Sequence, residues 1–238
     1  MPSPFFRFKQ FTIRHDHSSM KVGTDGVLLG AWASCKEKDS FSSTILDVGT
    51  GTGLIALMLA QRFPKKTIIG IDIDEASVLQ AKENVEMSPF STRVEIRKSD
   101  FKDIDCFCNK YSLISSNPPF YKEETLGGNK ARDAARHTSS LPFENLISNA
   151  AYLLADDGRF AVIIPYTETT NFISICAANK LYLTRRMDVR STEHRPFKRT
   201  LLEFEKHIKP VEASTLTLTD SSNNRTPQYV ELTKDFYL

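Results

Sequence analysis

The strongest candidates for chemistry lie at the end of an apolar run, where residues 111–116 give way to Asn117-Pro118-Pro119-Phe120. Proline fixes φ and cannot donate a hydrogen bond to a neighbouring strand, so a strand is expected to end here. The Asn117 side-chain oxygen and the Pro118 carbonyl can accept hydrogen bonds from an amine, and the Phe120 ring can stack on a planar base. We therefore expect a site at this strand tip, with Asn117, Pro118 and Phe120 as the candidate catalytic residues; a proline-rich turn is the alternative.

A glycine-rich stretch upstream supplies a second part of the site. Gly49, Gly51 and Gly53 follow an apolar run at residues 44–48, and a helix is expected directly after them. Glycines in this position allow a tight turn and the close approach of a ligand to the main chain. Asp72 stands 19 residues beyond Gly53, near the interval of about 20 at which an acid binds a pair of ribose hydroxyls. The spacing indicates a nucleoside ligand. The glycine spacing itself, G-x-G-x-G at residues 49–53, does not match the dinucleotide-binding pattern G-x-G-x-x-G.

The elements that would position these residues alternate between strand and helix. Strands are predicted at residues 44–48, 67–71, 93–97, 111–116 and 160–164, and helices at 54–63, 75–87, 143–155 and 168–179. Runs at 181–189 and 201–208 are predicted to pair as strands around a basic loop. Such alternation implies a parallel sheet with ligands bound beyond the carboxyl ends of its strands. We predict an α/β fold, a Rossmann-like, doubly wound, mostly parallel seven-stranded sheet with an antiparallel strand near the C-terminus and a small N-terminal extension.

In combination these motifs resemble the class I S-adenosylmethionine-dependent methyltransferases. The resemblance rests on D-V-G-T-G-T-G at residues 47–53, on Asp72 at a strand end, on Asp100 in K-S-D-F and on N-P-P-F, in that order. The last motif narrows it to the branch that methylates amino groups. It implies that S-adenosylmethionine is the cofactor and that Asp72 binds its ribose. The other implied cofactor-binding residues shape the pocket or flank the adenine: Asp47, Gly49, Gly51, Gly53, Asp100 and Phe101.

Further motifs make the resemblance more specific. The leader F-K-Q-F-T-I, the segment M-K-V-G-T-D-G-V-L-L-G-A-W, A-R-H at residues 135–137 and the terminal L-T-K-D-F-Y-L are similar to the bacterial family that methylates N6 of adenine 37, beside the anticodon of a valine tRNA. This resemblance extends over nearly the whole chain and implies a tRNA adenine-N6 methyltransferase. Phe120 is found at this position both in that family and in ribosomal guanine-N2 enzymes, so this motif does not distinguish adenine from guanine as the target base.

The predicted catalytic residues suit this chemistry on physical grounds. An amine on a purine is a weak nucleophile because its lone pair is delocalised into the ring, and two acceptors aimed at its hydrogens would localise the pair on nitrogen. No strong base is required, since a sulfonium is an activated methyl donor and positioning supplies much of the rate. A motif without an ionisable residue fits that requirement.

The chain is expected to divide into two parts. Residues 1–43 are predicted to be an N-terminal extension that covers the cofactor pocket, and residues 44–238 to be the S-adenosylmethionine-dependent methyltransferase domain. Within the extension a strand, a turn and a helix are predicted at residues 5–13, 23–26 and 27–33. Residues 117–140 form a long polar loop, and a loop of this length is usually functional. Residues 210–225, rich in Ser and Thr, are predicted to be a loop.

Charge is distributed unevenly along the chain. The formal net charge is +2, but residues 180–209 contain nine Lys and Arg against four acidic residues. A second basic stretch lies in the first 21 residues, where Lys and Arg alternate with phenylalanines. Basic and aromatic side chains together suit an RNA backbone and its stacked bases. The residues predicted to bind RNA, in the anticodon stem-loop of a tRNA, are Arg7, Lys9, Arg195, Lys198 and Arg199.

The remaining composition limits the protein class. The four cysteines have neither a zinc-ligand spacing nor the density of a disulfide framework, so free thiols and no bound metal are expected. No apolar run reaches the roughly 20 residues needed to cross a bilayer, and the N-terminus lacks a signal-peptide core. We therefore expect a cytoplasmic protein with no membrane partner, and a monomer. The alternatives are a methyltransferase for guanine N2 or protein glutamine, and a non-catalytic nucleoside- or RNA-binding protein.

Overall fold

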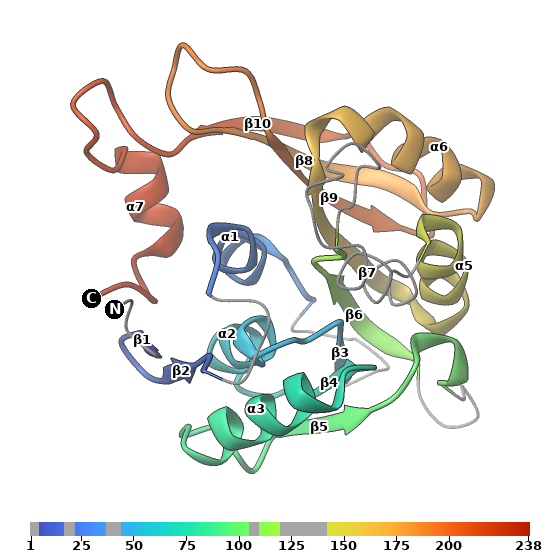
Figure 1. Cartoon of the computed structure of the whole chain (residues 1–238). Coiled ribbons are helices and arrows are strands. Elements are labelled where there is room, and N and C mark those ends of the chain that lie inside the picture. Colours follow the sequence, from blue (N-terminus) through green and yellow to red (C-terminus); the bar gives the residue numbers. More distant parts are fainter. Residues whose placement is uncertain (1–4, 17–21, 37–43, 105–109, 120–141) are drawn as a thin grey trace, which may run out of the picture.

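The structure, a computed structural model, describes residues 5–16, 22–36, 44–104, 110–119 and 142–238 (Figure 1). The strands are β1 (Phe5–Arg7), β2 (Thr12–Arg14), β3 (Thr44–Val48), β4 (Thr67–Asp72), β5 (Val94–Lys98), β6 (Tyr111–Ser116), β7 (Leu154–Pro165), β8 (Tyr182–Arg190), β9 (Arg199–Glu205) and β10 (Glu212–Thr217). The helices are α1 (Thr24–Trp32), α2 (Leu54–Arg62), α3 (Glu75–Glu86), α5 (Phe143–Leu153), α6 (Thr169–Ala178) and α7 (Pro227–Thr233). Two short 3-10 turns are η1 (Phe101–Asp103) and η2 (Tyr166–Glu168).

The centre of the molecule is an eight-stranded sheet with the order β10-β8-β9-β7-β6-β3-β4-β5, and β1 and β2 form a separate antiparallel pair. In the large sheet β9 runs antiparallel to both neighbours, β7 and β8, and the other neighbouring pairs are parallel. From β3 the chain adds β4 and β5 on one side and then returns to place β6 on the other. The order therefore reverses between β3 and β6, where ligands of open α/β sheets bind.

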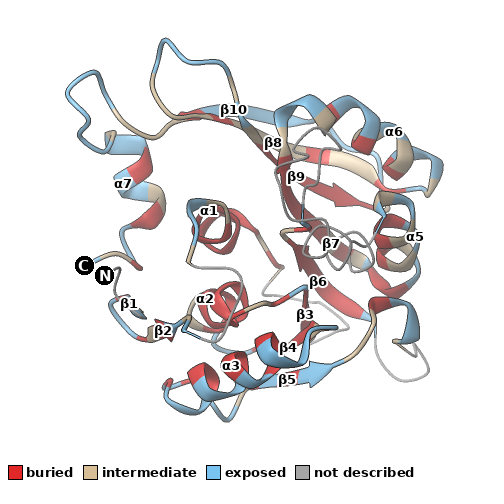
Figure 2. Ribbon diagram, in the orientation of Figure 1, coloured by how far each residue is buried: buried red, intermediate tan, exposed pale blue. Residues whose placement is uncertain are grey.

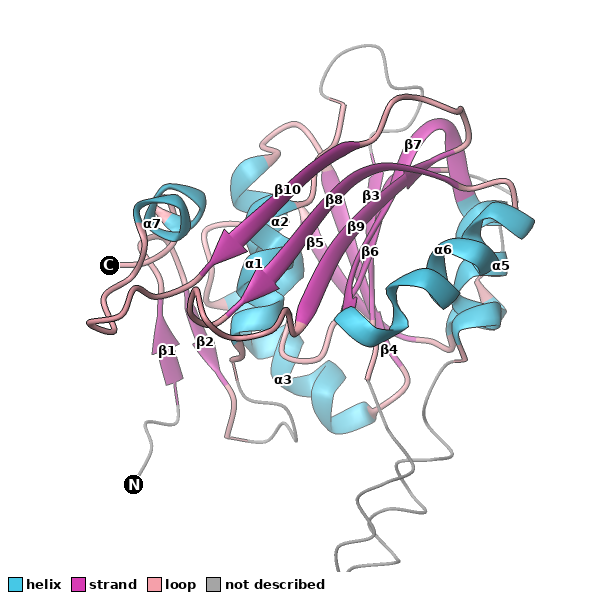
Figure 3. Cartoon of the chain, turned by 90° about the horizontal axis from the view of Figure 1, so that it is seen from above, coloured by secondary structure: helices cyan, strands magenta, loops and turns pink. Residues whose placement is uncertain are grey.

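Helices cover both faces of the sheet (Figure 3), with α1, α2 and α3 on one face and α5 and α6 on the other. The alternation of side chains along β7 shows the two layers directly. Ala161 and Ile163 belong to the buried cluster beneath α1 and α2, whereas Phe160, Val162 and Ile164 belong to the cluster beneath α5 and α6. Buried residues accordingly line the sheet and the helix sides that face it (Figure 2). Both faces are apolar because a parallel sheet with crossover helices has no solvated face.

Local sequence explains where the helices α3 and α7 begin. The Asp74 carboxylate accepts a hydrogen bond from the Ser77 main-chain N–H at 2.9 Å and so caps α3. Thr226 caps α7 by accepting from the Tyr229 N–H at 3.3 Å, and Pro227 occupies the first turn. Side-chain oxygens at these positions satisfy N–H groups that have no partner within the helix.

The two ends of the described chain pack together against α1 and α2. The Phe8 ring stacks on Phe11 at 4.8 Å between centroids and on Tyr237 at 6.1 Å, and the Lys9 N–H donates to the Phe236 carbonyl at 2.8 Å. Phe8 and Phe11 belong to the same buried cluster as α1 and α2. The strands β1 and β2 and the helix α7 therefore lie on one side of the molecule, away from α5 and α6 (Figures 1 and 3).

A buried acid of β9 fastens the end of α1 to the sheet. Glu203 of β9 is fully buried and accepts hydrogen bonds from the Ser34 N–H at 2.5 Å and from the Arg185 guanidinium at 2.7 Å. The same guanidinium lies over the Trp32 ring, 4.3 Å from its centroid. The charge of Glu203 is thus paired and hydrogen-bonded, as burial of an ion requires.

The fold class is confirmed, and several local predictions are corrected. The sheet has eight strands instead of seven, because β10 forms within the predicted loop at 210–225 and pairs with β8. The predicted strand at 5–13 is a hairpin, and the predicted turn at 23–26 lies largely inside α1. The polar sequence of β10 did not predict a strand. An edge strand pairs with only one neighbour and needs little burial, so it can form without an apolar pattern.

Two further expectations concern cysteines and membranes. Cys35 and Cys176 are buried free thiols, as predicted, whereas Cys106 and Cys108 lie outside the described residues. Within the described part of the chain, no helix combines the length and the hydropathy needed to cross a membrane.

Replacing Phe8 should destabilise the whole protein if the N-terminal strands share its core. Phe8→Ala is expected to lower the free energy of unfolding by about 3–5 kcal/mol, because a fully buried aromatic ring is lost. Phe5→Ala is the matched control, since Phe5 is 39% exposed, and it should cost about 0.5 kcal/mol or less. Urea denaturation followed by circular dichroism measures both. Equal midpoints for the two variants would show that the extension folds independently of the core.

Candidate active site

Strand register brings the three predicted parts of the site together. Val48, the last residue of β3, pairs with Ile71 of β4 on one side and with Ser116 of β6 on the other. The residues that follow these three are Gly49, Asp72 and Asn117, so they occupy adjacent strand ends. Neighbouring strands are about 4.8 Å apart. One small ligand can therefore reach all three positions.

The glycine turn between β3 and α2 requires glycine. Gly49, Gly51 and Gly53 have φ values of 69°, 56° and 81°, in the left-handed region that side chains disfavour. A Cβ atom added at Gly49 or Gly51 would meet nothing within 4 Å, whereas one at Gly53 would lie 3.4 Å from Ala81 of α3. Gly53 thus allows two helices to pack closely, and the other two leave open space beside bare main chain. That space fits a nucleoside cofactor.

A fully buried carboxylate holds this turn in place. Asp47 accepts hydrogen bonds from the Thr50 hydroxyl at 2.7 Å and from the Ser115 hydroxyl at 2.9 Å. It therefore joins the glycine turn to β6, the strand that carries Asn117. Burial raises the pKa of Asp47 to about 6, and the two hydroxyl donors act against this rise.

Asp72 contacts the turn from the neighbouring strand. One carboxylate oxygen accepts from the Gly51 N–H at 2.9 Å, and the other accepts from the Asp74 N–H at 3.0 Å. Burial raises the pKa of Asp72, and the main-chain N–H groups of Asp74, Gly51 and Ile73 partly compensate. A carboxylate has about four lone-pair positions, so acceptor capacity remains for a hydroxyl group of a ligand.

The next strand end supplies Asp100 and Phe101. Asp100 caps η1 by accepting from the Lys102 N–H at 3.0 Å, and its side chain is partly exposed. Phe101 is only 4% exposed, and its ring belongs to the cluster beneath α5 and α6. The Phe101 ring is therefore part of the core.

The residues predicted to be catalytic follow β6. Asn117 is half-buried, and no hydrogen bond joins its side chain to another residue in the described ranges. Pro118 is buried, and Pro119 is exposed. Phe120, the loop motif at 135–137 and most of the long loop lie outside the described residues. Asn117 thus follows the strand end nearest the glycine turn.

The predicted RNA-binding residues fall into two groups. The loop from β8 to β9 lies at the carboxyl ends of the parallel strands β7 and β8, and it carries Arg195 and Lys198 on its exposed surface. Arg199 begins β9 and forms an ion pair with Asp25 of α1 at 2.7 Å. These three cations are therefore at the same edge of the sheet as Asn117.

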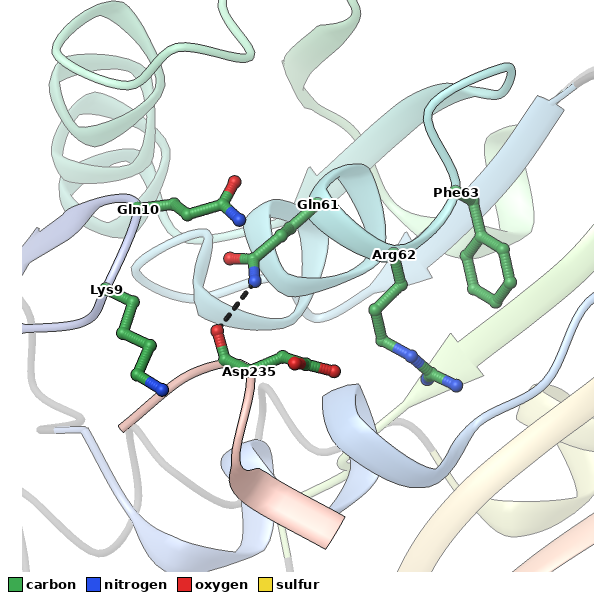
Figure 4. Close-up of a pocket in the computed structure, with 6 residues that line it drawn as sticks. All are labelled: Lys9, Gln10, Gln61, Arg62, Phe63 and Asp235. Carbon is green, nitrogen blue, oxygen red and sulfur yellow. Dashed lines mark hydrogen bonds between the residues drawn. The ribbon is translucent and has the colours of Figure 1, made fainter. Parts of the chain in front are cut away.

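Arg7 and Lys9 lie elsewhere. Arg7 is exposed on β1, with its guanidinium over the Phe5 ring. Lys9 lines an open polar pocket of about 540 Å³ together with Gln61, Asp235 and neighbouring residues (Figure 4). In this pocket the Gln61 amide donates to the Asp235 carbonyl at 2.8 Å. Because α2 starts at the glycine turn and Gln61 is near its other end, Lys9 is roughly 13 Å from the turn along the helix axis.

Sequence reasoning did not single out the residues that support the turn. Asn84 of α3 donates to the Thr52 carbonyl and to the Arg14 carbonyl, both at 2.9 Å, so it connects the turn to β2. Thr50 and Ser115 also support the turn, because both donate hydrogen bonds to Asp47. Their sequence signal is weak, because a polar residue within an apolar helix or strand has many structural uses. Among the described residues, no three His, Cys, Asp or Glu side chains form a metal-binding group.

Comparisons with known proteins agree with this geometry. Residues 31–173 match the family model of the methyltransferase small domain. The chain is 46% identical, over 98% of its length and 97% of the relative's, to a tRNA1(Val) (adenine(37)-N6)-methyltransferase of Trichodesmium erythraeum. It is 42% identical to the protein of the same name from Bacteroides fragilis, over 100% and 99% of the two chains.

A solved structure shows the same fold at low identity. A predicted O-methyltransferase from Agrobacterium tumefaciens superimposes with a TM-score of 0.69 at 17% identity, covering 89% of this chain and 96% of that one.

Asp47 should make stability depend on pH. Its pKa is about 6 in the folded protein against an ordinary value of 3.8, so between these values the folded state binds more protons than the unfolded state. Its contribution to stability is therefore lost as pH rises, by about 2–3 kcal/mol between pH 4 and pH 7. Asp47→Asn should remove this pH dependence.

Chemical denaturation at pH 4, 5, 6 and 7 measures the effect as the difference between wild type and variant. Asp156→Asn is the control, because the Asp156 side chain is 90% exposed. Parallel stability curves for wild type and Asp47→Asn would contradict the raised pKa.

Proposed function

The chain belongs to the methyltransferase small-domain family and to its group of bacterial tRNA1(Val) (adenine(37)-N6)-methyltransferases, and we propose that it methylates N6 of adenine 37 in a valine tRNA, with S-adenosylmethionine as the methyl donor. The observation that carries this proposal is the alignment of Asp72, the glycine turn and Asn117 at three adjacent strand ends. In this arrangement the glycine turn would bind the nucleoside of the cofactor. The acceptors at Asn117 and Pro118 would bind the amine that receives the methyl group.

The cofactor supplies a methyl group activated by a positive sulfonium. The chain contributes the residues that would hold it, and the open space beside Gly49 and Gly51 supports this assignment. We assign Asp72 to the ribose hydroxyls, because its carboxylate retains acceptor capacity beyond the main-chain donors of the turn. Asp47 keeps the turn in shape. Asp100 and Phe101 would flank the adenine.

Asn117 and Pro118 act on the target amine. The Asn117 side-chain oxygen and the Pro118 carbonyl accept its two hydrogens, which localises the lone pair on nitrogen. These hydrogen bonds strengthen as positive charge develops on the nitrogen, so they stabilise the transition state more than the bound substrate. Phe120 would stack on the target base. A base in an anticodon loop is already partly unstacked, so extruding it costs little.

RNA binding is assigned to the basic residues at both ends of the chain. Arg195, Lys198 and Arg199 lie at the strand edge of the site and would contact the anticodon stem-loop. Arg7 and Lys9 lie farther away and would contact more distant parts of the tRNA backbone. We propose that the protein acts as a monomer in the cytoplasm, where tRNA is available. The N-terminal extension would cover the cofactor site through β2 and its link to Asn84.

The direct test is methyl transfer to unmodified valine tRNA, followed by mass spectrometry of its nucleosides. N6-methyladenosine is expected, and replacing adenine 37 by guanine should abolish it. Methylation of guanine N2, or of a glutamine in a protein substrate, would establish one of the alternative functions. Absence of any transfer would leave a nucleoside- or RNA-binding protein.

Asn117→Ala should impair chemistry more than binding. Loss of one hydrogen bond made in the transition state reduces the single-turnover rate by about 10²–10³, with little change in tRNA or cofactor affinity. Asn117→Asp should retain more activity than Asn117→Ala, because the carboxylate is still an acceptor of similar reach. Asn171→Ala is the control, since Asn171 is exposed on α6. A wild-type single-turnover rate in Asn117→Ala would show that Asn117 only ends the strand.

Salt dependence should separate the two basic groups. Arg195→Ala/Lys198→Ala is expected to reduce the slope of log affinity against log salt by about 0.7 per lost phosphate contact, with both full-length tRNA and an isolated anticodon stem-loop. Arg7→Ala/Lys9→Ala should reduce the slope only with full-length tRNA. Filter binding over a range of salt concentrations measures both, and each variant loses two charges. Unchanged slopes for both variants would show that these cations are solvated surface residues that do not contact the RNA.

A further inference from the structure

Two aromatic rings and two guanidinium groups form a cluster at the end of β7. The Tyr166 and Phe197 rings lie 5.4 Å apart, with their planes inclined by 33°. The Arg186 guanidinium carbon is 5.8 Å from the centre of the Tyr166 ring, and that of Arg190 is 5.4 Å from the centre of the Phe197 ring. The two rings therefore contact each other, and one guanidinium adjoins each ring.

The cluster lies next to the proposed catalytic strand end. The last residue pair between β6 and β7 is Ser116 with Val162. Asn117 is one residue beyond this pair and Tyr166 is four residues beyond it, on adjacent strands. Tyr166 is therefore roughly 10 Å beyond Asn117 in the strand direction. That distance is suited to a nucleotide next to one whose base is bound at Asn117.

The rings are held in place without being part of either core. The Tyr166 N–H donates to the Lys198 carbonyl at 3.1 Å, which fixes η2 to the loop that carries Phe197. Both Asp188 oxygens accept from the Arg186 guanidinium at 2.9 Å, and Arg190 donates to the Thr217 hydroxyl at 2.9 Å. Of the described residues, neither buried cluster includes Tyr166 or Phe197.

Exposure and charge indicate the partner. Tyr166 is 37% exposed, although it lies among preorganised neighbours. The Arg186 charge is paired with Asp188, whereas Arg190, Arg195 and Lys198 add positive charge around the rings. Aromatic faces bordered by arginine and lysine suit the bases and phosphates of a single-stranded nucleic acid.

We propose that Tyr166 and Phe197 form a stacking subsite for the nucleotide that flanks the target adenine. The inference rests on the proposed function and extends it to a second position of the RNA. The subsite orients the RNA strand so that the target amine reaches Asn117. It adds affinity by stacking, which tolerates different bases because every base has a π face.

The test uses an anticodon stem-loop RNA with 2-aminopurine on either side of the target adenine, because stacking quenches its fluorescence. Wild type should quench one of the two positions on binding. Tyr166→Leu and Phe197→Leu keep an apolar side chain of similar reach but remove the ring, so they should lose the quenching and bind the RNA about tenfold or more weakly. Tyr166→Phe and Phe197→Tyr keep an aromatic ring, so they should show the same quenching and RNA affinity as wild type.

The control is Tyr152→Ala. Tyr152 is 60% exposed, and Lys110 lies over its ring at 5.7 Å, but it is near the start of β6 at the opposite edge of the sheet. S-adenosylmethionine affinity, measured by calorimetry, should be unchanged in all variants. Wild-type quenching and affinity in the leucine variants, with methyl transfer intact, would overturn the subsite and leave the proposed function standing. Failure of wild type to methylate the RNA would overturn both.

Discussion

The site depends on one buried interaction, the contact of the Asp47 carboxylate with the hydroxyls of Thr50 and Ser115. Asp47 lies on β3, Thr50 in the glycine turn and Ser115 on β6, so a single side chain fixes the relative position of the ligand-binding turn and the strand that ends at Asn117. The position excludes water, and the charged form is correspondingly costly. The two hydroxyl donors offset part of that cost, as buried acids require. A precise turn is thus obtained from an acid whose pKa is raised by burial.

The same sheet edge collects groups from distant parts of the chain. The end of β3 supplies the glycine turn, β4 supplies Asp72 and β6 supplies Asn117, while the β8–β9 loop brings Phe197 and Lys198 to the same edge. All of these face one way because the intervening strands are parallel and β9 is antiparallel. The antiparallel strand is significant here, since it reverses the chain and places a basic loop where parallel strands end. The residues proposed to bind the cofactor and those proposed to contact RNA can therefore be adjacent in space while about a hundred or more residues apart in sequence.

The face of the sheet that α1 covers has a structural role. There Glu203 binds Ser34 and Arg185, and Arg185 covers Trp32, so α1 is fastened to β8 and β9. The phenylalanines of the N-terminal strands pack on Tyr237 at the other end of the chain. These contacts explain why Phe8 and Phe11 are core residues although they alternate with basic side chains. The basic residues of this segment lie on its outer surface, with Lys9 beside the far end of α2.

The sequence by itself determined the alternation of strands and helices, the glycine turn, Asp72 and the strand end at Asn117, because each is encoded locally. Apolar runs of β-branched residues, left-handed glycines and paired prolines restrict the chain over a few residues. Only the tertiary structure decided which strand ends are adjacent, that polar residues 212–217 add an eighth strand, that the Phe101 ring is buried, and that Arg195 and Lys9 lie in different regions. These features depend on pairing and packing between residues far apart in the chain, and the free energy of such contacts has no signature in any short segment.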